Sequence, residues 1–340
     1  MISTDAGERF PVICVTPLYH FSSHSQEMSL GKGICISRYD SSGVSFDALL
    51  STLLNIHEPD FLLWYDPVIS KDVSPSELAS FLDVVSNPEE SKVLNLVRLF
   101  TERAASYFLV LRLFKPGRLR AGDTYIIVGT DAAGKWDTLG SGRASMMTVD
   151  YGMLGIRTGS YDLEADQIPF LAAFRKETMS LLNSLSSYPA LGYALTLYSE
   201  DHDEALDAVG SVTALEALLT KPGETEGLSY RLSLRIANLL GRDSTSRKDI
   251  FKEVKNFYNL RSRIVHGDLP DDRLLARLNV DSMRETLRRV LLSVMALYSE
   301  GMRPVDLPDR LDELALDDDA RKQLCATASK LLHITAAVSP

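Results

Sequence analysis

The sequence predicts an α+β protein, in which a mixed α/β N-terminal domain (residues 1–165) precedes an all-helical domain (residues 166–340). Three observations support this prediction. A chain of 340 residues exceeds the roughly 100–200 residues of a typical domain. Runs of β-branched and aromatic residues, broken by Gly, Pro, Asp and Ser, are concentrated before about residue 160. From about residue 167 onward, nearly every segment has the apolar spacing of a helix.

Each element follows from its local pattern. In the N-terminal domain, strands are expected at 11–19, 33–39, 61–69 and 124–129, and helices at 45–57 and 91–114. The second helix should end at the KPG of 115–117. The Gly- and Asp-rich residues 131–166 predict short strands and turns. Six helices are expected afterwards, at 167–186, 201–220, 226–241, 246–266, 272–300 and 317–335. The domain boundary should fall near residues 160–190.

Composition limits the functional classes. The hydrophobic fraction of 45% and the charged fraction of 24% are typical of a globular protein. The longest apolar runs, such as VLLSVMALY at 290–298, are too short to span a bilayer, so no membrane partner is expected. The opening MISTDAGERF lacks the features of a signal peptide. Cys14, Cys35 and Cys325 are widely spaced, which indicates reduced thiols and predicts a cytoplasmic protein.

The charge is distributed unevenly along the chain. The net charge of −10 alone argues against a nucleic-acid partner. Residues 231–290, however, contain 14 Lys and Arg against 8 Asp and Glu, so this segment carries +6 and the remaining 280 residues carry −16. The basic segment is either a surface for phosphates or a set of solvated helix faces.

Two motifs with known chemistry are rejected. GTDAAGKW at 129–136 matches GxxxxGK, but Trp136 replaces the hydroxyl residue of a P-loop and no helix is expected after it. His20 and His24 are four residues apart in a Ser-rich stretch, and no carboxylate cluster accompanies them or His57. We therefore expect no metal and no cofactor.

The helix at 246–266 contains an anomaly. Ser246 is the expected N-cap, with Asp249 as a weaker capping-box partner, and Gly267 suits a left-handed C′ position. At about 100° per residue from Val254, the apolar residues occupy a sector from about 240° to 40°. Arg261 falls in the middle of it at about 340°, and Ser262 and His266 fall at its edge, at about 80° and 120°.

Arg261 therefore needs an anion, because burying an unpaired guanidinium is costly. Glu216, which interrupts the apolar TALEALLT of 213–220, is one candidate, and a phosphate is another. In a purely structural interpretation, Arg261 pairs with Glu216 and His266 is stabilised by the helix dipole. Arg261 and His266 lie about 140° apart on one helix, so two facing copies would form a better site than one.

TALEALLT, GLSYRLSLRIANLLG (227–241) and IFKEVKNFYNLRSRIVHGD (250–268) together resemble the HEPN family (higher eukaryotes and prokaryotes nucleotide-binding domain), specifically its ApeA-like branch of antiphage proteins. The resemblance covers about residues 180–300. It implies a helical bundle that homodimerises and joins two Arg-x4-His motifs in one cleft. Active members are metal-independent endoribonucleases. Arg261 and His266 match the catalytic pair, and Ser262, Glu216 and Tyr258 match supporting positions.

The resemblance thus predicts an RNA-cleaving effector of toxin or antiphage type, with RNA, a second copy and a possible antitoxin or defence protein as partners. The N-terminal domain would be a sensor or regulatory module. The alternative is a non-catalytic HEPN dimer that binds RNA or serves as a protein scaffold.

Overall fold

The computed structural model describes residues 2–3, 9–10, 12–31, 33–38, 61–65, 90–117, 119–129, 136–143, 161–199, 204–267 and 280–336. The described residues up to Ala172 form one compact unit, and those from Ala173 form another. An antiparallel sheet lies in the first unit and helices make up the second, which confirms the α+β class. The division falls within helix α5, somewhat later than the predicted boundary at residues 165 and 166.

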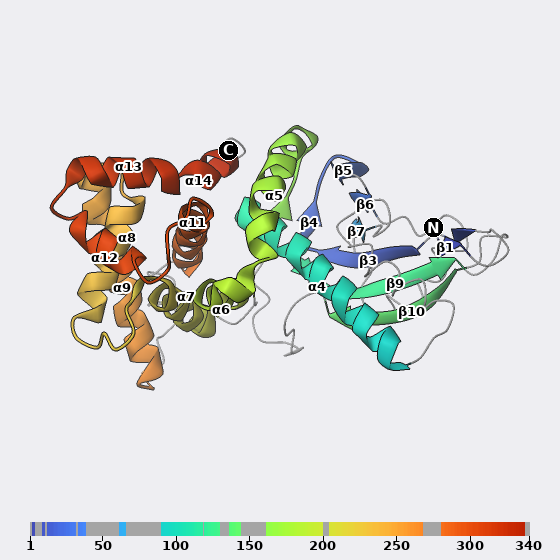
Figure 1. The fold of residues 1–340 in the computed structure, drawn as a ribbon, viewed down its shortest axis with the longest axis horizontal. Helices are drawn as coiled ribbons and strands as arrows, with labels where there is room; N and C mark the ends of the chain where they lie inside the picture. The colour runs from blue at the N-terminus through green and yellow to red at the C-terminus, as the bar shows by residue number, and fades with distance from the viewer. Residues whose placement is uncertain are drawn as a thin grey trace. The chain divides into compact units, whose positions relative to one another are not determined.

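The N-terminal unit is built on a seven-stranded sheet (Figure 1). Its strand order is β10-β9-β3-β7-β6-β5, with β8 also paired to β3, and all of these pairings are antiparallel. Cys14, Val15 and Leu18 of the central strand β3 are buried. The strands of this sheet are β3 (Val12–Tyr19), β5 (Glu27–Gly31), β6 (Ile34–Arg38), β7 (Phe61–Tyr65), β8 (Arg120–Ala121), β9 (Asp123–Gly129) and β10 (Trp136–Arg143).

Helix α4 (Glu90–Phe114) packs on this sheet against β3, β9 and β10. Two short pairs accompany the sheet: β1 (Ile2–Ser3) with β2 (Arg9–Phe10), and β4 (Phe21–Ser22) with β11 (Tyr161–Asp162). The predicted strands at 11–19, 33–39, 61–69 and 124–129 correspond to β3, β6, β7 and β9, and the helix at 91–114 corresponds to α4. The predicted helix at 45–57 lies outside the described residues.

The C-terminal unit consists of helices around α11 (Val280–Ser299), whose residues from Val290 to Tyr298 are all buried. That segment is the apolar run VLLSVMALY, and hydrophobic residues on every side suit a helix enclosed by others. The other helices that the structure describes after α4 are α5 (Ile168–Leu182), α6 (Pro189–Ser199), α7 (Glu204–Leu219), α8 (Leu228–Leu240), α9 (Ser244–Val265), α12 (Leu307–Glu313), α13 (Asp318–Ala328) and α14 (Lys330–Ala336), with 3-10 turns at Ala165–Gln167 and Leu185–Ser187.

Among the described residues, the largest differences between predicted and observed helices concern α6, α12 and the segment 317–335. Helices α6 and α12 were not expected. The single helix predicted at 317–335 is two helices, because α13 ends at Ala328 and α14 begins at Lys330. No helix in the described part of the chain is both long enough and apolar enough to cross a membrane.

A fully buried arginine joins three segments of the C-terminal unit. Arg235 of α8 donates to both carboxylate oxygens of Glu224 at 2.7 and 2.9 Å, to both of Asp312 at 2.8 and 2.7 Å, and to the Leu219 carbonyl at 2.7 Å. All five guanidinium N–H groups therefore have acceptors. The hydrogen bonds from Arg235 lower the pKa of Glu224 from 4.5 to about 2, against the opposing effect of burial.

Candidate functional site

Helix α9 carries four of the five predicted site residues, and its N-cap lies three residues before the expected one. Asp243 is the N-cap, and its carboxylate accepts from the backbone N–H groups of Thr245 and Ser246, both at 2.8 Å. Ser246 is the third residue of the capping box rather than the cap, and its hydroxyl accepts from the N–H of Asp243 at 3.0 Å. The prediction of Ser246 as N-cap was therefore wrong, since the carboxylate occupies the stronger capping position.

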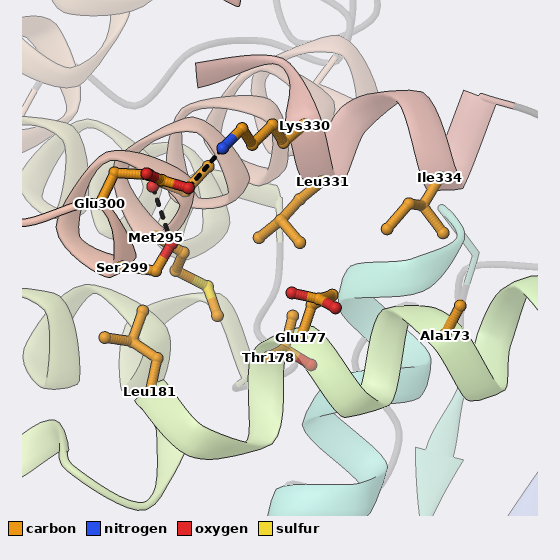
Figure 2. Close-up of a pocket in the computed structure, with 11 residues that line it drawn as sticks. Ala173, Glu177, Thr178, Leu181, Met295, Ser299, Glu300, Lys330, Leu331 and Ile334 are labelled. Carbon is orange, nitrogen blue, oxygen red and sulfur yellow. Dashed lines mark hydrogen bonds and ion pairs between the residues drawn. The ribbon is translucent and has the colours of Figure 1, made fainter. Parts of the chain in front are cut away.

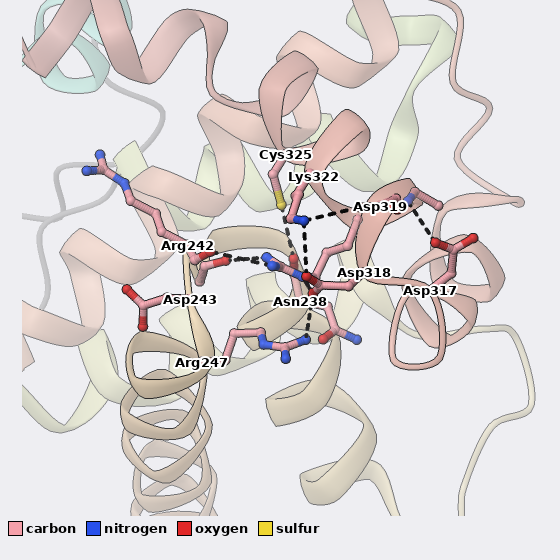
Figure 3. Close-up of polar contacts among 12 residues, drawn as sticks. Asn238, Arg242, Asp243, Arg247, Asp317, Asp318, Asp319, Lys322 and Cys325 are labelled. Carbon is pink, nitrogen blue, oxygen red and sulfur yellow. Dashed lines mark hydrogen bonds and ion pairs between the residues drawn. The ribbon is translucent and has the colours of Figure 1, made fainter.

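The turn before α9 is held against α13. Arg321 of α13 is buried and donates to the carbonyl of Gly241 at 2.8 Å. Figure 3 shows the polar contacts of this region, where Arg247 of α9 lies near Asp318 of α13. The start of α9 is thus fixed by contacts on both sides of the turn, which sets the direction of the whole helix.

The other end of α9 has the expected geometry. The helix ends at Val265, His266 is the C-cap, and Gly267 has a φ of 84°. The Gly267 N–H donates to the Ile264 carbonyl at 3.0 Å, and the His266 N–H donates to the Ser262 carbonyl at 3.1 Å. Gly267 is needed here because only glycine adopts this left-handed conformation without steric cost.

Three of the five predicted site residues converge where α9 packs on α7. The Arg261 guanidinium lies 3.6 Å from the carboxylate of Glu216, so the ion pair expected between them is present but is longer than a hydrogen bond. Tyr258 lies one turn earlier on α9. Its pKa is raised first by burial and then by the charge of Glu216, whereas Arg261 lowers it. The three groups therefore share one electrostatic environment.

Arg261 is short of acceptors. Its Nε is buried without a hydrogen-bond partner, and no hydrogen bond of its guanidinium is found within the described residues. Its side chain is nevertheless 28% exposed, so the group is reachable from solvent. The same helical unit satisfies every donor of Arg235. Arg261 thus has donor capacity left for an anion that the described residues do not supply.

His266 and Ser262 do not join this cluster. His266 is exposed, Ser262 is half-buried, and neither side chain makes a hydrogen bond in the part of the chain that the structure describes. Because α9 stays helical to Val265, Arg261 and His266 remain about 140° apart around its axis. Val265 is 52% exposed, although its helical position extends the apolar face of α9. One chain by itself therefore offers an arginine and a histidine on different faces.

A cavity of about 250 Å³ lies elsewhere in the C-terminal unit, between α5, α11 and α14. Figure 2 shows its walls, with Glu177 on one side and an ion pair between Lys330 and Glu300 on another. Leu181, Met295 and Leu331 supply apolar surface. None of the predicted site residues lines this cavity, and no feature of the sequence had indicated it.

The structure describes part of each rejected motif. Gly129 ends β9 and Trp136 begins the antiparallel strand β10, so a strand, not a helix, follows the GxxxxGK stretch. The Nδ1 of the exposed His24 lies 2.9 Å from the Glu164 carboxylate. Among the described residues no group of three or more His, Cys, Asp or Glu is arranged to hold a metal ion, and His57 lies outside them.

No family model matches the chain, and no curated protein or solved structure matches it either. The residues of α7 and α9 and their geometry are therefore what indicates a function for this chain.

Proposed function

We propose that this chain is a HEPN-type endoribonuclease that cleaves RNA without a metal ion, in a site shared by two copies, and acts as a toxin or antiphage effector. The observation that carries the proposal is that the Arg261 guanidinium has unused hydrogen-bond donors. Its Nε is buried and unpartnered, its nearest described carboxylate oxygen is 3.6 Å away, and the side chain is still reachable from solvent. An RNA phosphate has the charge and the oxygens to satisfy such a group.

The proposed cleavage reaction uses the 2′-OH of the RNA together with imidazole and guanidinium groups of the protein. The 2′-OH next to the scissile phosphate attacks phosphorus as one imidazole removes its proton, the bond from phosphorus to the 5′-oxygen breaks, and a second imidazole protonates that oxygen. Histidine suits both roles because its ordinary pKa is near neutrality. Arg261 would hold the phosphate oxygens and offset their developing charge. The products carry a 2′,3′-cyclic phosphate and a 5′-OH.

A second copy is part of the proposal because one helix separates its arginine from its histidine. A two-fold arrangement would supply two of each, so that Arg261 of one copy and His266 of the other can face the same phosphate. Val265 is 52% exposed immediately before His266 and continues the apolar face of α9, so a second copy that packs at this point would cover it.

One observation favours the competing function, a non-catalytic dimer that binds RNA or acts as a scaffold. Arg261 and Glu216 form an ion pair within the chain, at 3.6 Å, so the arginine has a structural role whether or not RNA is cleaved. The two functions differ in what they require of His266, which contributes no side-chain hydrogen bond to the described structure.

The test compares purified wild type and His266→Ala with total RNA in the presence of a chelator. We expect the wild type to cleave and to leave 5′-OH ends, and the variant to be inactive with an unchanged melting temperature, because the imidazole is exposed. Arg261→Ala is a poorer variant, since it also removes the partner of Glu216. Equal cleavage by both proteins, a requirement for magnesium, or 5′-phosphate ends would contradict the mechanism.

A further inference from the structure

The outward face of α9 carries a row of lysines. Lys248, Lys252 and Lys255 are all exposed, and none of them forms an ion pair or hydrogen bond within the described residues. On an ideal helix they fall at about 120°, 160° and 100° from Val254, and His266 falls at about 120°. Asn259 continues the row between them, at about 140°. The three lysines and His266 therefore lie along one side of the same helix.

This arrangement is not that of an ordinary solvated helix face. Such faces usually alternate acidic and basic residues at i, i+4 spacing, which stabilises the helix. Here Lys248 and Lys252 are four residues apart and Lys252 and Lys255 are three apart, so like charges are neighbours and destabilise α9. The two carboxylates described on α9 lie to one side of the row, with Asp249 at about 220°, one turn from Lys252, and Glu253 at about 260°. The row is cationic within a chain of net charge −10.

An aromatic pair, an exposed tyrosine and a half-buried phenylalanine, borders this row. The ring of Tyr230 on α8 contacts that of Phe251 on α9 edge to face, with centroids 5.5 Å apart and planes at 73°. Tyr230 is 58% exposed, so much of this residue is accessible to a ligand. Phe251 falls at about 60°, one turn from both Lys248 and Lys255 on the helix surface. The edge-to-face contact holds the tyrosine beside the lysines.

Cations that follow a line and an aromatic ring beside them are the two elements that proteins use to bind single-stranded nucleic acid. The lysines contact phosphates in sequence, and the ring stacks on a base that is not paired. A duplex would offer phosphates but no free base face. An acidic protein partner would use the charges but would give the exposed ring no comparable role.

We infer that Lys248, Lys252, Lys255 and Tyr230 form a subsite for single-stranded RNA, which guides the strand along α9 toward His266. From Phe251 to His266 the helix rises about 22 Å, so the subsite holds nucleotides several positions from the cleaved bond. This inference rests on the proposed function, because it assigns the substrate of that site as unpaired RNA and names the residues that bind it away from the reacting phosphate.

The test measures binding of a fluorescent single-stranded oligonucleotide with 2′-O-methyl groups, which cannot be cleaved through the 2′-OH. Changing Lys248, Lys252 and Lys255 together to Gln should weaken binding at least about tenfold at low salt. It should also flatten the slope of log affinity against log salt by about 2, since each phosphate contact on a single strand contributes about 0.7. The control changes Lys221, Lys322 and Lys330 to Gln, which are surface lysines that already have carboxylate partners.

Tyr230→Ala should weaken binding by about 5- to 100-fold and leave the salt slope unchanged, because stacking releases no counterions. Tyr193→Ala is its control, since Tyr193 is 51% exposed on α6 and should have no effect. The inference is overturned if the subsite variants bind the oligonucleotide as tightly as the control variants. It is also overturned if a duplex of the same length binds as tightly as the single strand and Tyr230→Ala does not change its affinity. If those outcomes occur while His266→Ala still abolishes RNA cleavage, the proposed function stands without this subsite; if the wild type neither binds nor cleaves RNA, both fail.

Discussion

The Glu216 carboxylate on α7 lies 3.6 Å from the Arg261 guanidinium on α9, and this pair is the point at which the structural and catalytic interpretations of the chain meet. In the structural interpretation the ion pair only stabilises the packing of α7 against α9, and Arg261 needs no further anion. In the catalytic one it orients an arginine that has donors left for phosphate. The unpartnered Nε of Arg261 favours the second, because buried donors in native proteins usually have acceptors.

The electrostatic contact of Glu216 with Tyr258 can be measured directly. Glu216→Gln removes a negative charge that disfavours the tyrosinate, so the pKa of Tyr258 should fall. It should stay above its ordinary value of 10.0, because burial is the larger cause of the shift. Ultraviolet pH titration measures this, with Tyr258→Phe proteins used to subtract the other tyrosines. A Tyr258 pKa that does not move would mean that the three residues do not share one environment.

The buried Arg235 should be far more important for stability than the exposed Arg231, although both bind Glu224. Arg235→Met leaves a buried carboxylate without its main partner and should cost about 3 kcal/mol or more in free energy of unfolding. Arg231→Met removes a partner whose side chain is 46% exposed and should cost less than about 1 kcal/mol. Urea denaturation provides both values. Similar losses for the two variants would contradict the assignment of Arg235 as the central group.

Glu224 should make the C-terminal unit sensitive to acid. Its pKa is lowered from 4.5 to about 2 in the folded protein, chiefly by hydrogen bonds from Arg235. A lowered pKa stabilises the fold at pH values above 4.5, and this stabilisation is lost as the pH falls from 4.5 toward 2. The total loss is on the order of 3 kcal/mol. The free energy of unfolding should be measured from neutral pH down to about pH 2 for the wild type and Glu224→Gln. The variant should be less stable at neutral pH, and its stability should fall less steeply with acid. Parallel curves for the two proteins would refute the linkage.

Two glycines at the ends of helices should respond differently to alanine. A Cβ on Gly241 would lie 2.6 Å from the Ala237 carbonyl oxygen, a backbone atom that cannot move aside, so Gly241→Ala should cost about 2 kcal/mol or more. Gly267 has open space around it, and Gly267→Ala should cost only about 1 kcal/mol, for the left-handed φ of 84°. Thermal melts of the two variants check this order, and the reverse order would contradict the packing of the turn between α8 and α9.

The sequence predicted the α+β class and the course of α9 from local patterns alone. Apolar periodicity located α7, α8 and α9, and Gly267 marked the end of α9 because its conformation is a local requirement. The start of α9 was misjudged because Asp243 and Ser246 can both cap a helix, and only the coordinates show which of them accepts from the backbone. Helix α12 was missed because it is only seven residues long, too short for its apolar spacing to show a period.

The candidate site was only partly predictable. The anomaly of Arg261 within an apolar sector is visible in the sequence, and Glu216 was a reasonable partner because it too interrupts apolar residues. That the pair is loose, and that the Arg261 Nε has no partner, depends on the distance between two helices, which no local pattern encodes. The aromatic contact of Tyr230 with Phe251 was likewise missed, because it joins two helices across a turn.

Because α11 is buried over residues 290–298, substitutions there are more restricted than substitutions on the outer side of α9. Changes at Val290–Tyr298 are restricted to apolar side chains of similar volume, since every residue there is enclosed. The outer side of α9 has no such packing restriction, because Lys248, Lys252 and Lys255 are exposed. Substitutions on that side can therefore change the charge of the surface while the packing around α11 stays the same.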